Sequence, residues 1–297
     1  MAAESVGMSQ KKKDRAATIG MIIFFSILAI LTVLPIYLLV LASFKPGNFL
    51  LQYGLNLNLD IPHLTLDNYK LLFTGKHDYW TWFGNSLILT VITVILTLAI
   101  SAFVAYGFAA YDFKGKNFFF IIVLLILSVP FEVIMLPLYK QISSWGMMDS
   151  YVSVVLPFLA HASTIFFFRQ YLLGLPKSLI EAGRIDGATE YGIATKIILP
   201  LTKPAFASMG ILQAMGSWNA ILWPLLVLKG AEKFTLPIGL NTLLTPYGNN
   251  YDVLIAGSMF GILPILVIFL IFQKYIIEGD SFSNNLSHDF SSFLSRL

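Results

Sequence analysis

The sequence predicts an all-α integral membrane protein with six transmembrane helices. Its 297 residues are 57% hydrophobic and only 12% charged, with a mean hydropathy of +0.77, which is too apolar for a soluble domain of this size. Six apolar stretches are long enough to cross a hydrocarbon core of ~30 Å at ~1.5 Å per residue. They cover residues 19–43, 83–108, 117–138, 151–173, 204–228 and 252–277. Most charged residues lie between these stretches, which argues against six core helices of a soluble enzyme.

The first stretch, 19–43, is predicted to stay in the mature protein as a membrane anchor. It follows a basic run at Lys11, Lys12 and Lys13, as in a signal peptide. However, the apolar run is too long for a signal peptide, and no small-residue cleavage site follows it. We interpret residues 1–18 as a tail whose lysines bind lipid headgroups rather than nucleic acid.

The basic residues predict the orientation in the membrane. Six of the nineteen lie on one side, namely Lys45, Lys70, Lys76, Lys140, Lys229 and Lys233. The other thirteen lie on the side that holds both termini. Because basic residues accumulate on the cytoplasmic side, both termini are predicted to be cytoplasmic.

The third stretch, 117–138, contains a proline and a carboxylate. Pro130 is expected to break the helix and free a backbone carbonyl, and Glu132 follows it. A charged side chain within a membrane is a functional candidate by default. Glu132 either lines a translocation path or lies at the membrane surface.

The fourth stretch, 151–173, ends at Arg169, which we expect to extend toward the inner interface. The fifth, 204–228, supplies amides and indoles as candidates for a substrate path: Gln213, Trp218, Asn219 and Trp223. Aromatic rings can stack on sugar faces and amides can bind hydroxyl groups, but helix packing uses the same residue types. Asn219 and Trp223 are four residues apart and are expected to share one helix face.

An outer segment, 229–251, precedes the last stretch and has a polar tip. The tip consists of Tyr247, Gly248, Asn249, Asn250 and Tyr251. It is either a contact for an external binding protein or an ordinary exposed loop. After the sixth stretch, residues 279–297 form a predicted cytoplasmic tail.

Motifs for chemistry within the chain are missing from the sequence. It has no cysteine, so disulfides and thiolate metal sites are excluded. The four histidines lack metal-ligand spacing, and no Walker A pattern or catalytic cluster occurs. We therefore predict no metal site, no cofactor bound by this chain, no nucleic-acid partner and no enzymatic activity. Energy for any transport must come from outside the chain.

The inner loop, 174–203, is unusually organised for a loop between membrane helices. Pro176 suits the first turn of a helix, Gly187 is expected to close that helix, and Thr189 to start a second one that Pro200 ends. Small residues at Ala182, Gly183 and Gly187 are expected to let a partner approach closely. Such a loop predicts docking with a soluble protein.

This loop resembles the EAA loop of permeases from binding-protein-dependent ABC importers. The matching residues are Glu181, Ala182, Gly187, Ile197, Leu199 and Pro200, with Gly183 where the family pattern has a second alanine. Asp186 and Ala188, in Ile185-Asp186-Gly187-Ala188, are similar to the carbohydrate-uptake branch, the maltose-type permeases with six spans. So are Trp218-Asn219 and Trp223-Pro224-Leu225.

The resemblance covers about residues 19–278 and implies the type I ABC permease fold in a bacterial cytoplasmic membrane. It implies a second permease subunit as a heterodimer partner, two ATP-binding subunits that hold ATP and Mg²⁺, and a solute-binding protein outside. The inner loop then acts as the coupling helix. The alternatives are an ion-coupled secondary transporter, a membrane enzyme or scaffold, or a permease for a solute such as a glycerol phosphate. The tail after Glu278 departs from the glycine- and lysine-rich tail of many relatives.

Overall fold

A computed structural model describes residues 2–54, 57–58, 61–74, 78–245 and 248–294. This part of the chain is helical apart from two strands of two residues each. It divides into two compact units, Met1–His77 with Leu243–Phe260, and Asp78–Thr242 with Gly261–Leu297. The all-α fold predicted from the sequence is confirmed.

The first unit begins with a long apolar helix. Its helices are α1 (Ala2–Ser43), α2 (Gly47–Tyr53), the 3₁₀ turn η1 (Ile61–His63), α3 (Asp67–Thr74) and the start of α15 (Tyr251–Leu294). Strands β1 (Leu244–Thr245) and β2 (Gly248–Asn249) pair antiparallel, with Leu244 opposite Asn249. The Asn68 amide of α3 donates to the carbonyls of Ser43 and Lys45, at 2.8 and 2.9 Å. It thereby satisfies carbonyls that the end of α1 leaves free.

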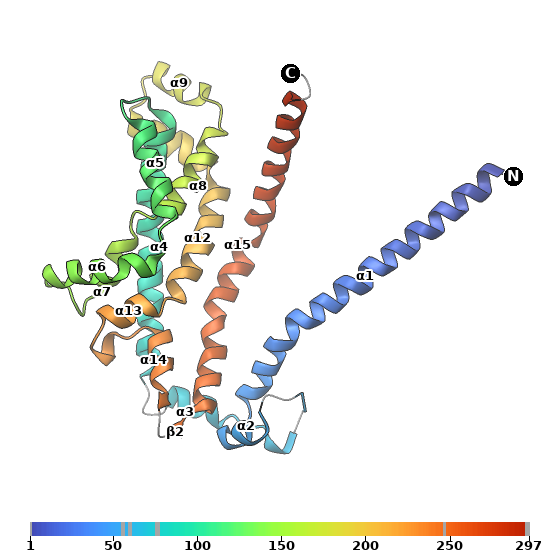
Figure 1. Ribbon diagram of the computed structural model, residues 1–297, viewed down its shortest axis with the longest axis vertical. Coiled ribbons are helices and arrows are strands. Elements are labelled where there is room, and N and C mark those ends of the chain that lie inside the picture. The colour runs from blue at the N-terminus through green and yellow to red at the C-terminus, as the bar shows by residue number, and fades with distance from the viewer. Residues whose placement is uncertain (1, 55–56, 59–60, 75–77, 246–247, 295–297) are drawn as a thin grey trace. The chain divides into compact units, whose positions relative to one another are not determined.

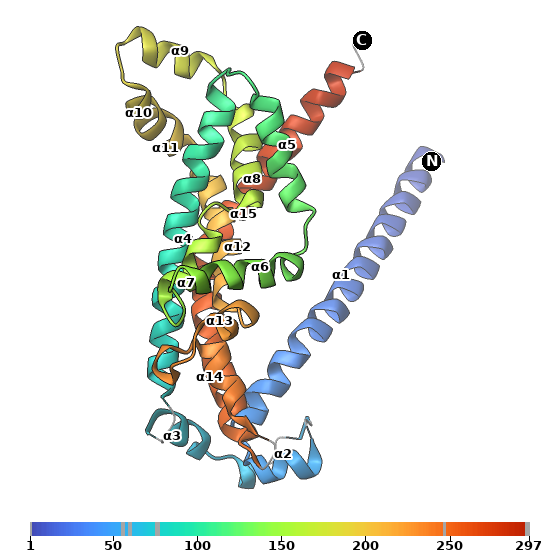
Figure 2. The ribbon, with the colours of Figure 1, turned by 60° about the vertical axis from the view of Figure 1, so that its left-hand side comes forward.

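The second unit is built along α4 (Tyr79–Ala110), an unbroken helix of 32 residues. In Figures 1 and 2, α4 runs between α9 (Ser178–Ile185) at one end and α14 (Leu236–Thr242) at the other. Hydroxyl residues follow one buried stripe of this apolar helix: Ser86, Thr90, Thr93, Thr97 and Ser101. Their spacing of three or four residues places them on one helix face.

Among the described residues, three helices are long and apolar enough to cross a membrane, and three bent pairs are further candidates. The unbroken spans are Thr18–Ser43, Tyr79–Ala110 and Tyr251–Ile271. In the first pair, α5 (Lys116–Leu127) and α6 (Phe131–Ser144) are bent by 103°. In the second, α7 (Tyr151–Val155) and η2 (Leu156–Phe158) are bent by 41° from α8 (Ala162–Leu173). In the third, Glu190–Leu201 is bent by 78° from α12 (Lys203–Trp218). The break predicted at Pro130 is confirmed, and α6 then runs crosswise to α4 (Figures 1 and 2).

The predicted fifth stretch, 204–228, is two helices rather than one. α12 ends at Trp218, and α13 (Leu222–Val227) starts after a break. Pro224 explains the break, because it has no N–H to donate to a preceding turn and is tolerated in the first turn of a new helix. The expectation that Asn219 and Trp223 share one helix face is therefore wrong.

Buried side chains of the second unit form two separate clusters. The loop-side cluster joins α4, α8 and α12 to the 174–203 loop, and includes Tyr106, Phe168, Ile193, Ile198 and Met209. The far-side cluster joins α6, α7, α13 and the segment after α13, and includes Leu89, Ile142, Val154, Trp223 and Ile238. α4 contributes to both clusters, so it links the two ends of the unit.

Candidate functional site

A cavity of about 390 Å³ lies where the helices of the second unit break. Phe131 follows the α5–α6 break, His161 lies in the η2–α8 break, and Asn219 to Ile221 form the α12–α13 break. All of these residues line the cavity. Three interruptions of helical structure thus converge on one space of a size typical for small-molecule sites.

Breaks inside apolar helices that are candidates for membrane spans need a physical reason. Backbone N–H and C=O groups without partners are costly in hydrocarbon, so irregular backbone is tolerated only where protein surrounds it or where it lines a cavity. At the α12–α13 break, Asn219 N–H donates to Met215 O at 3.1 Å and Ala220 N–H donates to Ser217 O at 3.3 Å. The breaks therefore present backbone polar groups beside the cavity.

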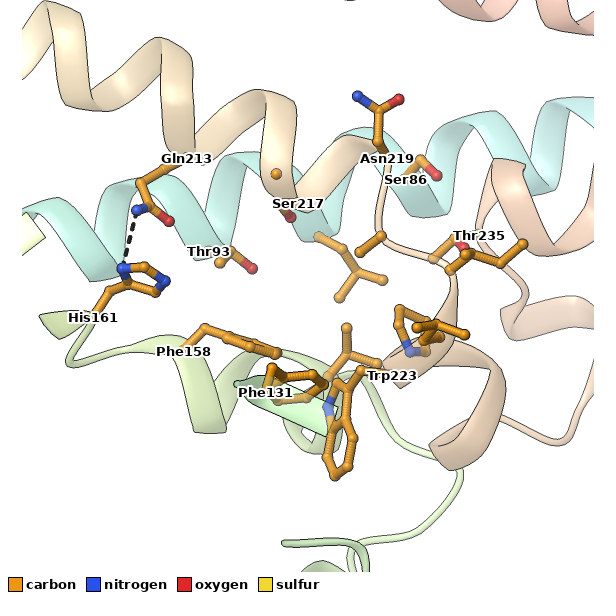
Figure 3. Close-up of a pocket in the computed structure, with 17 residues that line it drawn as sticks. Ser86, Thr93, Phe131, Phe158, His161, Gln213, Ser217, Asn219, Trp223 and Thr235 are labelled. Carbon is orange, nitrogen blue, oxygen red and sulfur yellow. Dashed lines mark hydrogen bonds between the residues drawn. The ribbon is translucent and has the colours of Figure 1, made fainter. Parts of the chain in front are cut away.

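One wall carries an amide and an imidazole. Gln213 of α12 donates to Thr164 Oγ1 of α8 at 2.9 Å, and its Nε2 lies 3.4 Å from His161 Nδ1 (Figure 3). Ser163 Oγ lies 2.8 Å from the same imidazole nitrogen. These contacts fix the orientation of Gln213 and His161 toward the cavity. Aromatic rings at Phe131, Phe158 and Trp223 also line the cavity.

The remaining polar side chains of the cavity are uncharged. They are the hydroxyls of Ser86, Thr93, Ser217 and Thr235 and the amide of Asn219 (Figure 3). Thr235 Oγ1 is buried and has no hydrogen-bond partner among the described residues. Among the described residues, no Asp, Glu, Lys or Arg lines the cavity.

The candidate path residues are placed differently from one another. Gln213 and Trp223 line the cavity, but the Trp223 indole donates to Ser153 O at 2.9 Å and is buried. Asn219 lines the cavity edge, with its amide pointing away from the centre in Figure 3. Trp218 donates to Gly261 O at 3.1 Å and lies outside the cavity, and Glu132 is exposed on α6 and does not line it.

Sequence reasoning missed the contribution of α4. Ser86, Leu89 and Thr93 line the cavity, yet the 83–108 stretch supplied no candidate residue. The stripe of Ser and Thr residues on this apolar helix was the signal that could have identified them. Thr235 had no comparable signal, because it lies in an irregular segment.

The 174–203 loop forms two short helical segments at one end of α4. α9 is followed by a turn at Gly187, where φ is +75°. Gly187 N–H donates to Arg184 O and Ala188 N–H to Gly183 O, the pattern of a helix end closed by a left-handed glycine. Thr189 Oγ1 then accepts from Gly192 N–H at 3.1 Å and starts α10 (Glu190–Gly192). The predicted closing and starting residues are thus confirmed.

The second segment continues beyond the predicted end. The π-helix η3 (Ile193–Ile198) follows α10, and α11 (Leu199–Leu201) contains Pro200 in its first turn. Proline has no backbone N–H to donate to the preceding turn. The π-helix before Pro200 is compatible with this missing hydrogen bond. Ile197 and Leu199 pack against the loop-side cluster, whereas Pro200 is exposed.

Gly183 does not belong to an exposed small-residue face, as the sequence suggested. It is buried, and a Cβ atom there would meet Ile193 Cγ1 at 2.9 Å and Ile197 Cδ1 at 3.0 Å. Gly183 is therefore small because α9 packs directly on η3. Ala182 and Gly187 do lie on the exposed side.

A polar network fixes the loop to the end of α4. Arg184 Nε donates to Glu190 Oε1 at 2.6 Å, and Tyr111 OH donates to Glu190 Oε2 at 2.7 Å. The hydrogen bond from Arg184, followed by the one from Tyr111, lowers the pKa of the Glu190 carboxyl. Burial, followed by the Glu190 contact, raises the pKa of Tyr111 to about 12. The network holds α9 at a fixed position relative to α4.

The outward surface of the loop combines apolar and acidic side chains. Ile185 is 85% exposed and Tyr191 is 69% exposed, which is unusual for residues of this kind. Glu181, Ala182, Asp186 and Ala188 are exposed beside them. Such a surface can bind another protein through an apolar centre with an acidic rim.

The predicted external tip falls partly outside the described residues. Tyr247 lies outside them, Gly248 and Asn249 form β2, and Tyr251 starts α15. The backbone N–H of Asn250 donates to Leu243 O at 3.4 Å. The role of this tip stays a prediction.

Comparison with known proteins identifies the family. Residues 100–278 match the family described as "Binding-protein-dependent transport system inner membrane component". The arabinooligosaccharides transport system permease protein AraQ of Bacillus subtilis (strain 168) is 53% identical over 261 residues, which cover 88% of this chain and 93% of AraQ. The multiple sugar-binding transport system permease protein MsmG of Streptococcus mutans serotype c is 34% identical over 283 residues, covering 91% and 98%.

A solved structure matches the fold. It is the crystal structure of a bacterial ABC transporter involved in the import of the acidic polysaccharide alginate, with a TM-score of 0.77 and 24% identity. The match covers 89% of this chain and 98% of that chain. Members of the family are transport components rather than enzymes. The chain belongs to the family of binding-protein-dependent transport system inner membrane components.

Proposed function

We propose that this chain is a permease subunit of an ATP-driven importer for a neutral oligosaccharide built from pentose or hexose units. The cavity at the three helix breaks carries this proposal. Its amide, imidazole and hydroxyl groups can bind sugar hydroxyls, and its aromatic rings offer apolar faces for the C–H faces of a sugar. Both sugar-transporting relatives, AraQ and MsmG, support the same substrate class.

The charge of the cavity favours a sugar over a phosphorylated solute. A glycerol phosphate carries negative charge, and burying that charge without a cation is strongly unfavourable. In the part of the chain that the structure describes, no Lys or Arg lines the cavity. A neutral sugar has no charge to bury, so we favour a sugar over a glycerol phosphate as the substrate.

The partners follow from the family and from the loop surface. A second, related permease completes the translocation path, and an external solute-binding protein delivers the sugar. Two ATP-binding subunits hold ATP and Mg²⁺ and bind the exposed side of α9 through Ile185 and its acidic neighbours. In this arrangement both termini and the 174–203 loop face the cytoplasm, and the 247–251 tip faces the binding protein.

Reconstitution with the partner subunits tests the proposal. The complete complex in proteoliposomes, with its binding protein outside and ATP inside, is given labelled arabino-oligosaccharides, malto-oligosaccharides and glycerol 3-phosphate. We expect ATP-dependent accumulation of at least one neutral oligosaccharide and none of the glycerol phosphate. Accumulation of glycerol phosphate alone, or accumulation driven by an ion gradient without ATP, would contradict the proposal.

A further inference from the structure

Asp149 connects two segments of the far-side cluster through five hydrogen bonds. It lies in the turn between α6 and α7. Its Oδ1 accepts from the backbone N–H groups of Lys229 and Gly230, at 2.9 and 3.1 Å. The Lys233 ammonium donates to Asp149 Oδ2 at 2.7 Å and to Asp149 O at 2.8 Å. Asp149 N–H donates to Val227 O at 2.7 Å. We call this set of contacts the Asp149 latch.

The backbone of Asp149 is itself unusual. Its φ is +56°, the only positive φ of a non-glycine residue in the described ranges. Aspartate tolerates this region better than most residues, but the conformation persists only when the surroundings fix it. The contacts of the latch provide that constraint.

A second set of bonds holds the same segment to α4. Tyr151 OH donates to Asn85 Oδ1 at 2.7 Å, and the Asn85 amide donates to the carbonyls of Glu232 and Phe234, both at 2.9 Å. Leu236 N–H donates to Ser86 Oγ at 2.8 Å. The segment from 227 to 236 is therefore bonded on one side to the start of α7 and on the other to α4.

These bonded segments form one wall of the cavity. Val154 of α7, Trp223 and Pro224 of α13, and Thr235 all line it. Behind this wall the bonds are short and numerous. At the breaks that connect the wall to α8 and α12, the backbone bonds vary more in length: Leu159 N–H to Leu156 O and Ala220 N–H to Ser217 O measure 3.4 and 3.3 Å, whereas Asn219 N–H to Met215 O and Ile165 N–H to His161 O measure 3.1 and 3.0 Å.

We propose that Asp149 is a positioning residue for transport. It makes α7, α13 and the 228–236 segment move as one rigid wall when the cavity opens outward, together with the end of α4 to which Asn85 and Ser86 bond them. The inference rests on the proposed function, because it assumes that ATP hydrolysis drives this opening. Without the latch the segments separate from each other instead, and hydrolysis continues with less transport.

Three variants weaken the latch by different amounts. Asp149→Gly keeps the positive φ without strain and removes every carboxylate bond. Asp149→Asn tolerates the same φ and keeps an acceptor for the backbone N–H groups, but loses the charge next to Lys233. Lys233→Met removes the ammonium alone. Lys229→Met is the matched control: it removes the same charge four residues away, and only the backbone of Lys229 takes part in the latch.

The test measures sugar imported per ATP hydrolysed in the reconstituted complete complex, together with the yield of assembled complex. We expect Asp149→Gly and Lys233→Met to lower this ratio by about fivefold or more, Asp149→Asn by less, and Lys229→Met not at all. Yield should stay at the wild-type amount, and amide exchange in 228–236 should accelerate in the same order.

The outcomes separate the latch from the proposed function. An unchanged ratio despite faster amide exchange would overturn the positioning role, and so would a loss explained entirely by lower yield. If the wild-type complex imports no sugar, the proposed function fails. In that case equal exchange rates in Asp149→Gly and wild-type complexes would also refute the latch, whereas faster exchange would support it.

Discussion

At Gly183 the backbone of α9 lies so close to η3 that an added Cβ atom would come within 2.9 Å of Ile193 Cγ1. The 2.9 Å contact is with an inner atom of Ile193, which is β-branched and fully buried, so one methyl group requires Ile193 to shift slightly and a branched side chain requires a larger displacement. From the sequence we expected the small residue at this position to let a partner protein approach, whereas it lets η3 of the same chain approach. The spacing within a motif does not reveal what packs against it. Ala182, the adjacent residue, faces outward instead.

Gly183→Val is therefore expected to detach α9 from η3, whereas Gly183→Ala is tolerated. Overpacking of this kind costs ~1–3 kcal/mol, which should appear as faster amide exchange across 178–198. Ala182→Val is the control, since it adds a comparable branched side chain on the exposed side and should leave exchange unchanged. Equal exchange in Gly183→Val and wild type would show that the close packing is not needed.

Gln213 is the path candidate that the structure supports best, because its amide lines the cavity and contacts Thr164 and His161. One hydrogen bond to a sugar is worth ~1 kcal/mol net. Gln213→Ala should lower uptake by about fivefold without lowering complex yield. Gln141→Ala makes the same change on an exposed face of α6 and should retain wild-type uptake. A parallel fall in yield and uptake for Gln213→Ala would identify a helix-packing residue instead.

Among the elements, the interrupted helices determine where the cavity forms. Proline marked the α5–α6 break in the sequence, so that interruption was predictable. The α12–α13 break was not, because Pro224 lies three residues beyond it and the apolar run continues through 204–228. Hydrophobicity reports that a segment lies in the membrane, but it does not report whether the segment stays helical.

The latch between the α6–α7 turn and the segment after α13 predicts a specific pH response. The hydrogen bond from Lys233, followed by those from the backbone of Lys229 and Gly230, holds the pKa of Asp149 well below its usual 3.8. A depressed carboxyl pKa stabilises the fold above the unfolded value, and this stabilisation is lost only as pH falls toward the folded value. The Lys233 pKa is raised, so its contribution is lost only at high pH.

Amide exchange in 228–236, corrected for its intrinsic pH dependence, should therefore show constant protection between about pH 5 and pH 9. Asp149→Asn should show lower protection across the whole range. A loss of protection between pH 7 and pH 5 in the wild-type complex would contradict the assigned ionic contact.

On the scale of the whole molecule, composition and the spacing of apolar stretches were sufficient for the fold class, and the loop pattern was sufficient for the family. The cavity was beyond sequence reasoning, because its walls come from Thr93, His161, Gln213 and Thr235, which are distant along the chain. The packing of α4, α8, α12 and the segment after α13 brings them together. The side of the membrane that each loop faces is still a prediction from basic residues.

Reporter fusions test that orientation. With six crossings, a fusion at Gly187 should report the cytoplasm and one at Asn249 the outside, as the distribution of basic residues requires. Fusions after Gly54 provide a further outer position. Reporters on the same side at Gly187 and Asn249 would rule out the six-span topology.

Gly187 offers the most direct test of coupling through the 174–203 loop. A second glycine, Gly146, closes α6 with the same pattern: φ is +69°, Gly146 N–H donates to Ser143 O, and Met147 N–H donates to Ile142 O. An added Cβ atom meets nothing within 4 Å at either glycine. Replacing each by tryptophan thus imposes similar backbone strain at opposite ends of the unit.

The deciding measurement is binding-protein-stimulated ATP hydrolysis and sugar uptake by complete complexes carrying Gly187→Trp or Gly146→Trp, at matched yield. We expect Gly187→Trp to lower both by at least about tenfold, because the indole blocks the ATP-binding subunit from α9 and 1.4 kcal/mol of lost coupling is a factor of ~10. Gly146→Trp should keep most of the stimulated ATP hydrolysis, which is the compared activity because the α6–α7 turn also carries Asp149. Wild-type uptake in Gly187→Trp, or equal losses in the two variants, would contradict docking of the ATP-binding subunits on this loop.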